Sequence, residues 1–174
     1  MRILIAEDDA DSSESYKDVL EARNHLVMLA ENGEECLKIY SEELKREQIE
    51  IEKRERKTTP FDAVILDYMM PQKDGMQVAK EILEMNPKQR IIFASAYVEE
   101  TLEDAVKQLK QVVELMQKPF AVDALVDTIE DKEIYDGLKE IMLSMKQIKN
   151  ESPSPQQLKS LFESLRKIQK GRTF

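Results

Sequence analysis

Residues 61–67, Phe-Asp-Ala-Val-Ile-Leu-Asp, decide the fold, because an apolar run of strand length ends there in the carboxylate of Asp67. Residues 3–9, Ile-Leu-Ile-Ala-Glu-Asp-Asp, repeat this pattern and end in three acids. Short, continuously apolar runs are typical of strands buried on both faces of a parallel sheet. Ligands bind at the carboxyl ends of such strands, so the two acidic ends are expected to meet in one crevice.

The alternation of strand-like runs with segments of helical period continues through residues 1–131. The strand-like runs lie at residues 2–6, 26–30, 61–66, 90–94 and 112–116, and later helical segments lie at residues 76–85, 102–110 and 122–129. This rhythm predicts five strands and five helices. Right-handed crossovers make the α/β fold a doubly wound parallel sheet that is covered on both faces.

A long second helix is predicted, because twelve charged residues crowd between positions 42 and 57 before Pro60 ends the run. Opposite charges stand four residues apart as Glu42/Arg46, Glu50/Arg54 and Glu52/Arg56. We expect a solvated helical extension here. A docking surface is the alternative.

Residues 132–174 predict a helical extension that follows the main domain of residues 1–131. Two stripes of heptad spacing, one beginning at Ile134 and one at Leu158, predict helices at about 132–150 and 155–170 on either side of a Ser/Pro break. Each stripe is too short to be stable alone. Docking on the chain's own domain, homodimerisation through these helices, and disorder remain alternatives.

Charge is divided unevenly between the two parts, although the whole chain of 174 residues carries a net charge of −9. Residues 1–131 hold 17 Lys/Arg against 30 Asp/Glu, whereas residues 132–174 hold 9 against 5. An acidic main domain argues against nucleic-acid binding and leaves the tail a weak candidate for an anionic partner.

The single cysteine, Cys36, excludes an internal disulfide and a multi-cysteine zinc site. No apolar stretch approaches the roughly 20 residues that span a bilayer, and the first apolar run is too short for a signal peptide. A cytoplasmic protein without a membrane partner is expected.

The strand-end acids Glu7, Asp8 and Asp67 predict a site for a hard divalent cation. Three neighbouring carboxylates repel one another unless a cation lies among them, and Mg²⁺ prefers such oxygen ligands together with water and phosphate. One carboxylate would then remain available as a nucleophile toward phosphorus.

Two further strand ends supply what a transferred phosphoryl group needs, namely a hydroxyl donor and a compact cation. Ser95 follows the apolar run at residues 91–94, and Lys118 follows residues 112–117. Lys118 precedes a proline, which makes a cis peptide bond plausible.

In chain order, these motifs resemble the receiver domain of two-component response regulators, a CheY-like, flavodoxin-like fold with strand order 2-1-3-4-5. The resemblance covers about residues 1–131 and rests on residues 3–9, 67–75, 95–96 and 118–120. It implies that a histidine kinase phosphorylates Asp67. It also implies that Glu7, Asp8, Asp67 and the backbone carbonyl of Met69 hold Mg²⁺.

The resemblance further implies a switch made by Ser95 and Lys118, and two positions depart from its usual pattern. Leu115 stands where the family commonly has a tyrosine or phenylalanine, and Tyr97 is the candidate substitute. Met69 and Tyr97, each two positions beyond a key residue, are bulky and are poor bases for orienting water. They predict slow loss of the phosphoryl group.

The function implied is a signalling switch and not an enzyme with turnover, since it catalyses only its own phosphorylation and dephosphorylation. We expect an output through an unknown downstream protein and no DNA binding, because a helix-turn-helix is not evident in the tail. A DNA-binding transcriptional regulator and a phosphorelay intermediate are the alternatives. A remote one is a magnesium-dependent phosphohydrolase of the haloacid-dehalogenase type, which places a second aspartate where this chain has Met69.

Overall fold

A computed structural model describes residues 1–51, 59–96, 113–131 and 135–137 of the chain. The chain divides into two compact units, Met1–Val126 and Asp127–Phe174. The predicted fourth helix at residues 102–110, Tyr97, and the two predicted tail helices lie outside the described residues, apart from a helical stretch at residues 135–137. No described helix is long and apolar enough to cross a membrane.

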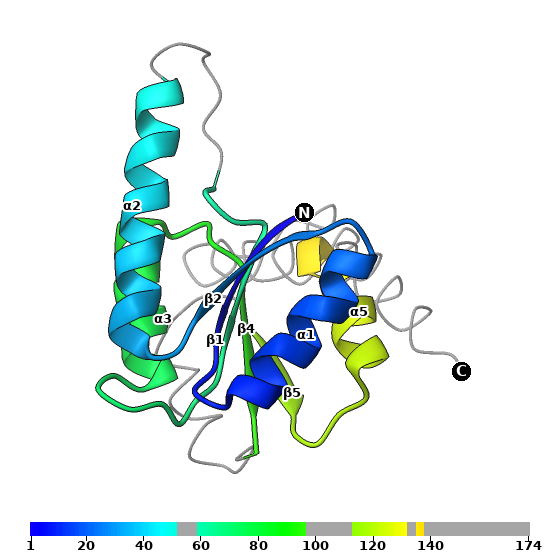
Figure 1. Cartoon of the computed structure of the whole chain (residues 1–174). Coiled ribbons are helices and arrows are strands. Elements are labelled where there is room, and N and C mark those ends of the chain that lie inside the picture. The colour runs from blue at the N-terminus through cyan, green and yellow to red at the C-terminus, as the bar shows by residue number, and fades with distance from the viewer. Residues whose placement is uncertain (52–58, 97–112, 132–134, 138–174) are drawn as a thin grey trace, which may run out of the picture. The chain divides into compact units, whose positions relative to one another are not determined.

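Five parallel strands form one sheet in the order β2-β1-β3-β4-β5, as predicted (Figure 1). The strands are β1 Arg2–Ala6, β2 Leu26–Ala30, β3 Ala63–Leu66, β4 Ile91–Ser95 and β5 Glu114–Gln117. In the register of β1 with β3, Ala6 lies opposite Leu66. The residues that follow these two strands therefore emerge side by side at the carboxyl edge of the sheet.

The described helices are α1 Ala10–Ala22, α2 Gly33–Ile51, α3 Gly75–Met85 and α5 Val122–Glu130. Asp9 and Asp74 cap α1 and α3, and their carboxylates accept hydrogen bonds from the backbone amides of Ser12 and Gln77, both at 2.8 Å. Each cap satisfies an amide that has no partner within the helix, so both helices begin directly after a strand-end loop.

Side chains of alternate residues along the strands build two apolar layers, because successive residues of a strand point to opposite faces of the sheet. The layer that packs against α2 and α3 contains Leu4, Val64, Leu66, Ile91 and Phe93 from the strands. Tyr16 and Leu20 of α1 are buried on the opposite side of the sheet, which α1 covers (Figure 1). Both faces of the central strands are thus covered, and their carboxyl ends carry the polar groups.

The far end of α2, up to Ile51, extends beyond the sheet, and residues 52–57 of the predicted charge-rich helix lie outside the described residues (Figure 1). One expected pairing was wrong: Arg46 lies 2.6 Å from Glu43 and not next to Glu42, because Glu43 is buried and also binds Arg2 at 2.6 Å. The carboxylate of Glu43 therefore attracts the guanidinium groups of both Arg2 and Arg46. Ile49, farther along the helix, is 61% exposed.

A second ion pair ties β4 to β5 at the amino edge of the sheet. The guanidinium of Arg90 donates to both carboxylate oxygens of Glu114, with Nε–Oε2 at 2.7 Å and Nη2–Oε1 at 2.8 Å. The Arg90 side chain is only 4% exposed, so this bidentate pair is shielded from water. It fixes the edge strand β5, whose opposite end leads into Lys118.

Candidate functional site

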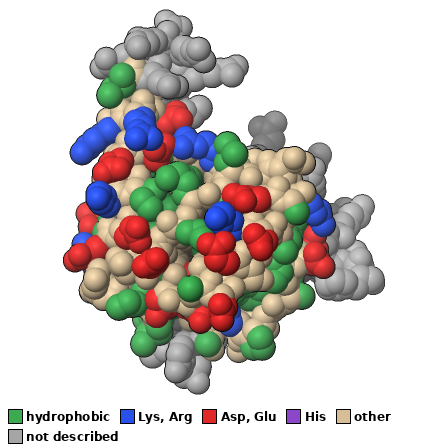
Figure 2. Space-filling model, in the orientation of Figure 1, with side chains coloured by type: hydrophobic (Ala, Val, Ile, Leu, Met, Phe, Trp, Pro, Cys, Tyr) green, Lys and Arg blue, Asp and Glu red, His purple; other side chains and the backbone are tan. Residues whose placement is uncertain are grey.

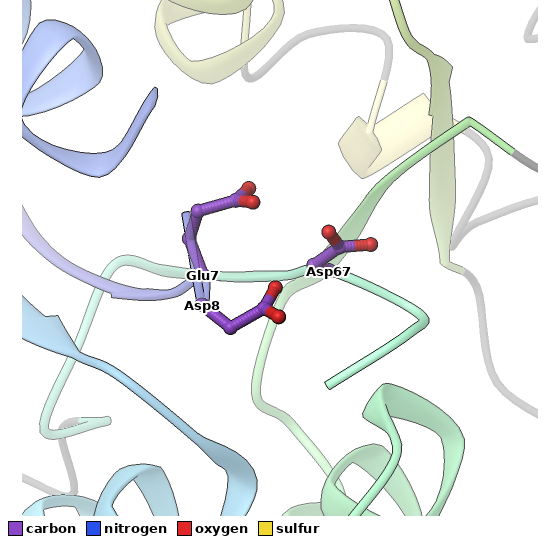
Figure 3. A group of neighbouring side chains, drawn as sticks. All are labelled: Glu7, Asp8 and Asp67. Atoms are coloured by element: carbon purple, nitrogen blue, oxygen red, sulfur yellow. The ribbon is translucent and has the colours of Figure 1, made fainter. Parts of the chain in front are cut away.

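Three carboxylates converge where β1 and β3 end. Glu7 and Asp8 follow β1, Asp67 follows β3, and one carboxylate oxygen from each lies within 4.8 Å of those from the other two (Figure 3). The Asp67 amide donates to the carbonyl of Ala6 at 2.9 Å, which extends the pairing of the strands into the site. The parallel register therefore brings together acids that are far apart in the sequence.

The ammonium group of Lys118 lies among these acids. Its Nζ is 2.5 Å from Glu7 Oε2 and 2.9 Å from Asp67 Oδ2. The Lys118 amide also donates to the carbonyl of Ser95 at 2.8 Å, so the backbone of this residue continues the ladder between β4 and β5. The peptide bond between Lys118 and Pro119 is cis, as the sequence suggested.

Burial dominates the electrostatics of Glu7, which is 4% exposed. Loss of water raises the pKa of its carboxyl group to about 7, although the nearby Lys118 ammonium opposes this rise. Burial by itself would lower the pKa of Lys118. Its hydrogen bonds to Glu7 and Asp67 outweigh that effect, and the pKa of Lys118 is raised. The lysine therefore stays charged between the two acids.

Asp67 is oriented by its neighbours and remains partly open to solvent. Lys118 contacts Oδ2, the Met69 amide donates to Oδ1 at 3.3 Å, and the Asp67 side chain is 13% exposed. Glu7 is almost fully enclosed and Asp8 is exposed. Of the three acids, Asp67 alone combines a fixed direction with access from outside.

The loop after Asp67 is closed by a tight approach at Gly75. The Gly75 amide donates to the carbonyl of Tyr68 at 3.0 Å, and a Cβ atom at position 75 would lie 2.2 Å from the carbonyl oxygen of Asp67. No side chain fits at that distance, so this position requires glycine. The sequence placed Gly75 only at the end of the motif at residues 67–75 and did not show the contact that demands glycine.

The remaining predicted site residues lie near this centre or outside the described chain. Ser95 ends β4 and is 1% exposed, and Met69 is 58% exposed beside Asp67. Leu115 lies in β5 and packs against the apolar layer shared with α2 and α3. Tyr97 is not among the described residues. The roles assigned to these residues stay predictions.

One neighbour of the site, the buried Tyr16 of α1, was not predicted from the sequence. The Tyr16 ring stacks on Phe120, two residues beyond Lys118, with ring centroids 5.5 Å apart. No local spacing could have revealed this contact, because it joins the first helix to the loop after the last strand.

The donor set suits Mg²⁺. All three acidic side chains offer oxygen, and hard cations prefer carboxylate oxygen together with water. Lys118 balances only part of the negative charge at full ionisation, so a divalent cation would relieve the rest. Figure 2 shows further acidic side chains spread over the visible face, which adds to the attraction for cations.

Comparison with known proteins gives one consistent family. The family model of the response regulator receiver domain matches residues 3–130. The receiver protein CpdR of Brucella abortus is 29% identical over 132 residues, which are 74% of this chain and 93% of CpdR. The transcriptional regulatory protein RprY of Bacteroides fragilis is 30% identical over 75% of this chain, but the match spans only 48% of RprY.

A solved structure of similar fold comes from the same class of proteins. The response regulator protein TrrA of Thermotoga maritima, in complex with Mg²⁺ and a beryllium fluoride, is 28% identical and has a TM-score of 0.57. The match covers 74% of this chain and 96% of TrrA. That relative is thus a response regulator whose structure contains magnesium.

Proposed function

Since this chain belongs to the response regulator receiver domain family, we propose that it is a phosphorylation-controlled switch whose phosphoryl acceptor is Asp67. The observation that carries the proposal is the contact of Lys118 Nζ with Asp67 Oδ2 at 2.9 Å, inside a cluster of three carboxylates. Receiver domains are signalling switches that work with histidine kinases and downstream partners.

Asp67 is the proposed nucleophile because its carboxylate is held in place and can be reached from solvent. One of its oxygens forms a bond to phosphorus while the phosphorus–nitrogen bond of a phosphohistidine breaks, and the departing imidazole keeps the bonding electrons and takes up a proton. The product is an aspartyl phosphate. Its formation adds negative charge to a site that is already acidic.

The surrounding residues of this chain would manage that charge. The Lys118 ammonium, fixed between Glu7 and Asp67, offers a positive group to the phosphoryl oxygens, and the Ser95 hydroxyl is the proposed donor from β4. Glu7, Asp8 and Asp67, with the backbone carbonyl of Met69, would hold Mg²⁺. When bound, that ion neutralises charge shared between carboxylate and phosphoryl oxygens.

The acceptor is tested with acetyl phosphate and Mg²⁺, followed by intact-protein mass spectrometry. We expect a single labile phosphoryl adduct on the native chain and its loss in Asp67→Ala. Asp18→Ala, which removes an exposed acid from α1, is the matched control and should be labelled normally. An adduct that persists in Asp67→Ala would refute the assignment.

The output is proposed to be a change in protein contacts, within the cytoplasm, with turnover limited to the domain's own phosphorylation and dephosphorylation. What supports this is the sequence of residues 132–174, where two heptad stripes carry only scattered Lys and Arg. A pair of helices as predicted from this pattern favours helix–helix contact over DNA readout. The chain also spans about half the length of RprY, so the activity of such longer regulators is not transferred to it.

Light scattering after size-exclusion chromatography tests the output on the full chain, with and without beryllofluoride and Mg²⁺. We expect the mass to change on addition of the mimic, and Leu161→Glu to abolish the change. Ser160→Glu adds the same charge beside the stripe and should behave as the native chain. A mass that never changes would exclude dimerisation as the output.

A further inference from the structure

The loop that follows Lys118 is anchored by an aromatic stack. Between Lys118 and the start of α5, Pro119 and Ala121 are exposed, whereas Phe120 is half-buried. The Phe120 ring lies on Tyr16 of α1 with centroids 5.5 Å apart and planes inclined by 24°. Stacked rings attract beyond simple area burial, so this contact holds a segment whose neighbours on both sides face solvent.

The stack closes a ring of contacts around the acid cluster. Glu7 and Asp8 follow β1, Asp9 caps α1, and Tyr16 lies about two turns into that helix. From Tyr16 the contact passes to Phe120, along two residues of backbone to Lys118, and from its ammonium back to Glu7. These contacts connect α1 to the Lys118 side chain.

The charges of the site also act on Tyr16. Burial raises the pKa of Tyr16, while the charge on Lys118 lowers it and the charges on Glu7 and Asp67 raise it. Tyr16 is 8% exposed, so these charges act on a buried group.

We propose that Tyr16 is a positioning residue, which through its stack on Phe120 holds the Lys118 ammonium in the direction that phosphoryl transfer to Asp67 requires. The inference rests on the proposed function of Asp67. The ring carries this role, because the ring makes the contact with Phe120. Small displacements of a fixed charge weaken its effect on a reacting group, so the stack matters for rate.

Two variants separate the ring from the hydroxyl. Tyr16→Leu keeps an apolar side chain of moderate size but removes the stack, and Tyr16→Phe keeps the stack but removes the hydroxyl. Leu20→Ala, on the same buried face of α1, is the control for general loss of stability. Each protein is assayed as the full chain at a temperature where melting curves show it folded.

The first readout does not need phosphorylation. In ¹⁵N-labelled native protein, the hydrogen-bonded Lys118 ammonium should give a protected NMR signal that Lys118→Ala removes. We expect Tyr16→Leu to lose this protection, and Tyr16→Phe and Leu20→Ala to retain it. A Lys118 signal that stays protected in Tyr16→Leu would overturn the inference, whatever becomes of Asp67 labelling.

The second readout is the rate of labelling by acetyl phosphate, together with the Kd for Mg²⁺ from calorimetry. Tyr16→Leu should slow labelling by about two- to tenfold, the range expected from the energy of one aromatic pair, and leave the Kd within about twofold. If Tyr16→Leu lost both labelling rate and Mg²⁺ affinity, and Leu20→Ala lost them to the same extent, the role of Tyr16 would be merely structural and the inference would be overturned. If acetyl phosphate did not label the native chain, the proposed function itself would be refuted.

Discussion

Replacing Glu7 by glutamine should stabilise the metal-free protein at alkaline pH. The amide would keep the shape of the side chain and an oxygen that can accept from Lys118, but it cannot ionise. The pKa of the native Glu7 carboxyl is raised from 4.5 to about 7, chiefly by burial. The folded state therefore holds a proton that the unfolded chain releases, and stability is lost as the pH rises from about 4.5 to about 7.

The size of the effect follows from the shift. A change of 1 in pKa corresponds to about 1.4 kcal/mol. The rise in the pKa of Glu7 from 4.5 to about 7 therefore makes the native protein about 3 kcal/mol less stable to unfolding at pH 8 than Glu7→Gln, which stays neutral. At pH 5 the difference should be below about 1 kcal/mol, since the lower pH favours the protonated carboxyl in the unfolded chain as well. Because Glu7 is buried, screening by solvent does not reduce this difference in stability.

Urea unfolding followed by far-ultraviolet circular dichroism, in EDTA at pH 5 and pH 8, measures both values. Glu21→Gln removes an exposed acid from the end of α1 and should change stability by less than about 0.5 kcal/mol at either pH. Addition of Mg²⁺ should stabilise the native chain more than Glu7→Gln, since the ionised carboxylate is the proposed ligand. Equal stability of Glu7→Gln and the native chain at pH 8, or an equal gain at both pH values, would refute the reasoning.

Four further predictions concern Gly75, Asp8, Glu114, and the pair Met69 and Tyr97. Gly75→Ala places a Cβ 2.2 Å from the Asp67 carbonyl oxygen, so unfolding by urea should show a loss of about 2 kcal/mol or more, with slower acetyl-phosphate labelling. Asp8→Asn removes a proposed ligand charge and should raise the Kd for Mg²⁺ by at least about tenfold in calorimetry; an unchanged Kd would place the ion elsewhere. Glu114→Ala leaves the buried Arg90 without this carboxylate and should cost about 3 kcal/mol or more of folding stability, whereas a loss within experimental error would show that the pair contributes nothing. The bulk of Met69 and Tyr97 predicts a slow autophosphatase, and a phosphoryl lifetime of seconds at 25 °C in purified protein would contradict it.

The strand-end acids were accessible to prediction because their position depends on pattern alone. A continuous apolar run specifies a doubly covered strand, and parallel strands with right-handed crossovers place all carboxyl ends on one edge. The register that sets Ala6 opposite Leu66 then brings Glu7 and Asp67 together. Lys118 and Ser95 were found in the same way, as residues that end strand-like runs.

Side-chain partners were less accessible, since they depend on which atoms burial brings into reach. Arg46 was expected to bind Glu42 by helical spacing, but the buried Glu43 draws both Arg46 and Arg2. Tyr16 lies on the buried face of α1, yet nothing in its neighbourhood along the chain points to Phe120. The face of a helix on which a residue lies predicts that the residue is buried. Only the packed structure shows which side chain it contacts.

The amino-acid order by itself thus determined the α/β alternation, the strand order implied by its resemblance, and the edge of the sheet where charge collects. The alternation and the charged edge arise from short-range periodicity and the handedness of the chain, which are local properties, whereas the strand order came from the resemblance alone. Tertiary structure alone decided that Lys118 lies between Glu7 and Asp67, that burial lifts the pKa of Glu7 to about 7, and that Tyr16 stacks on the lysine loop. Each depends on distance and loss of water between groups as far as 111 positions apart, which no local pattern encodes.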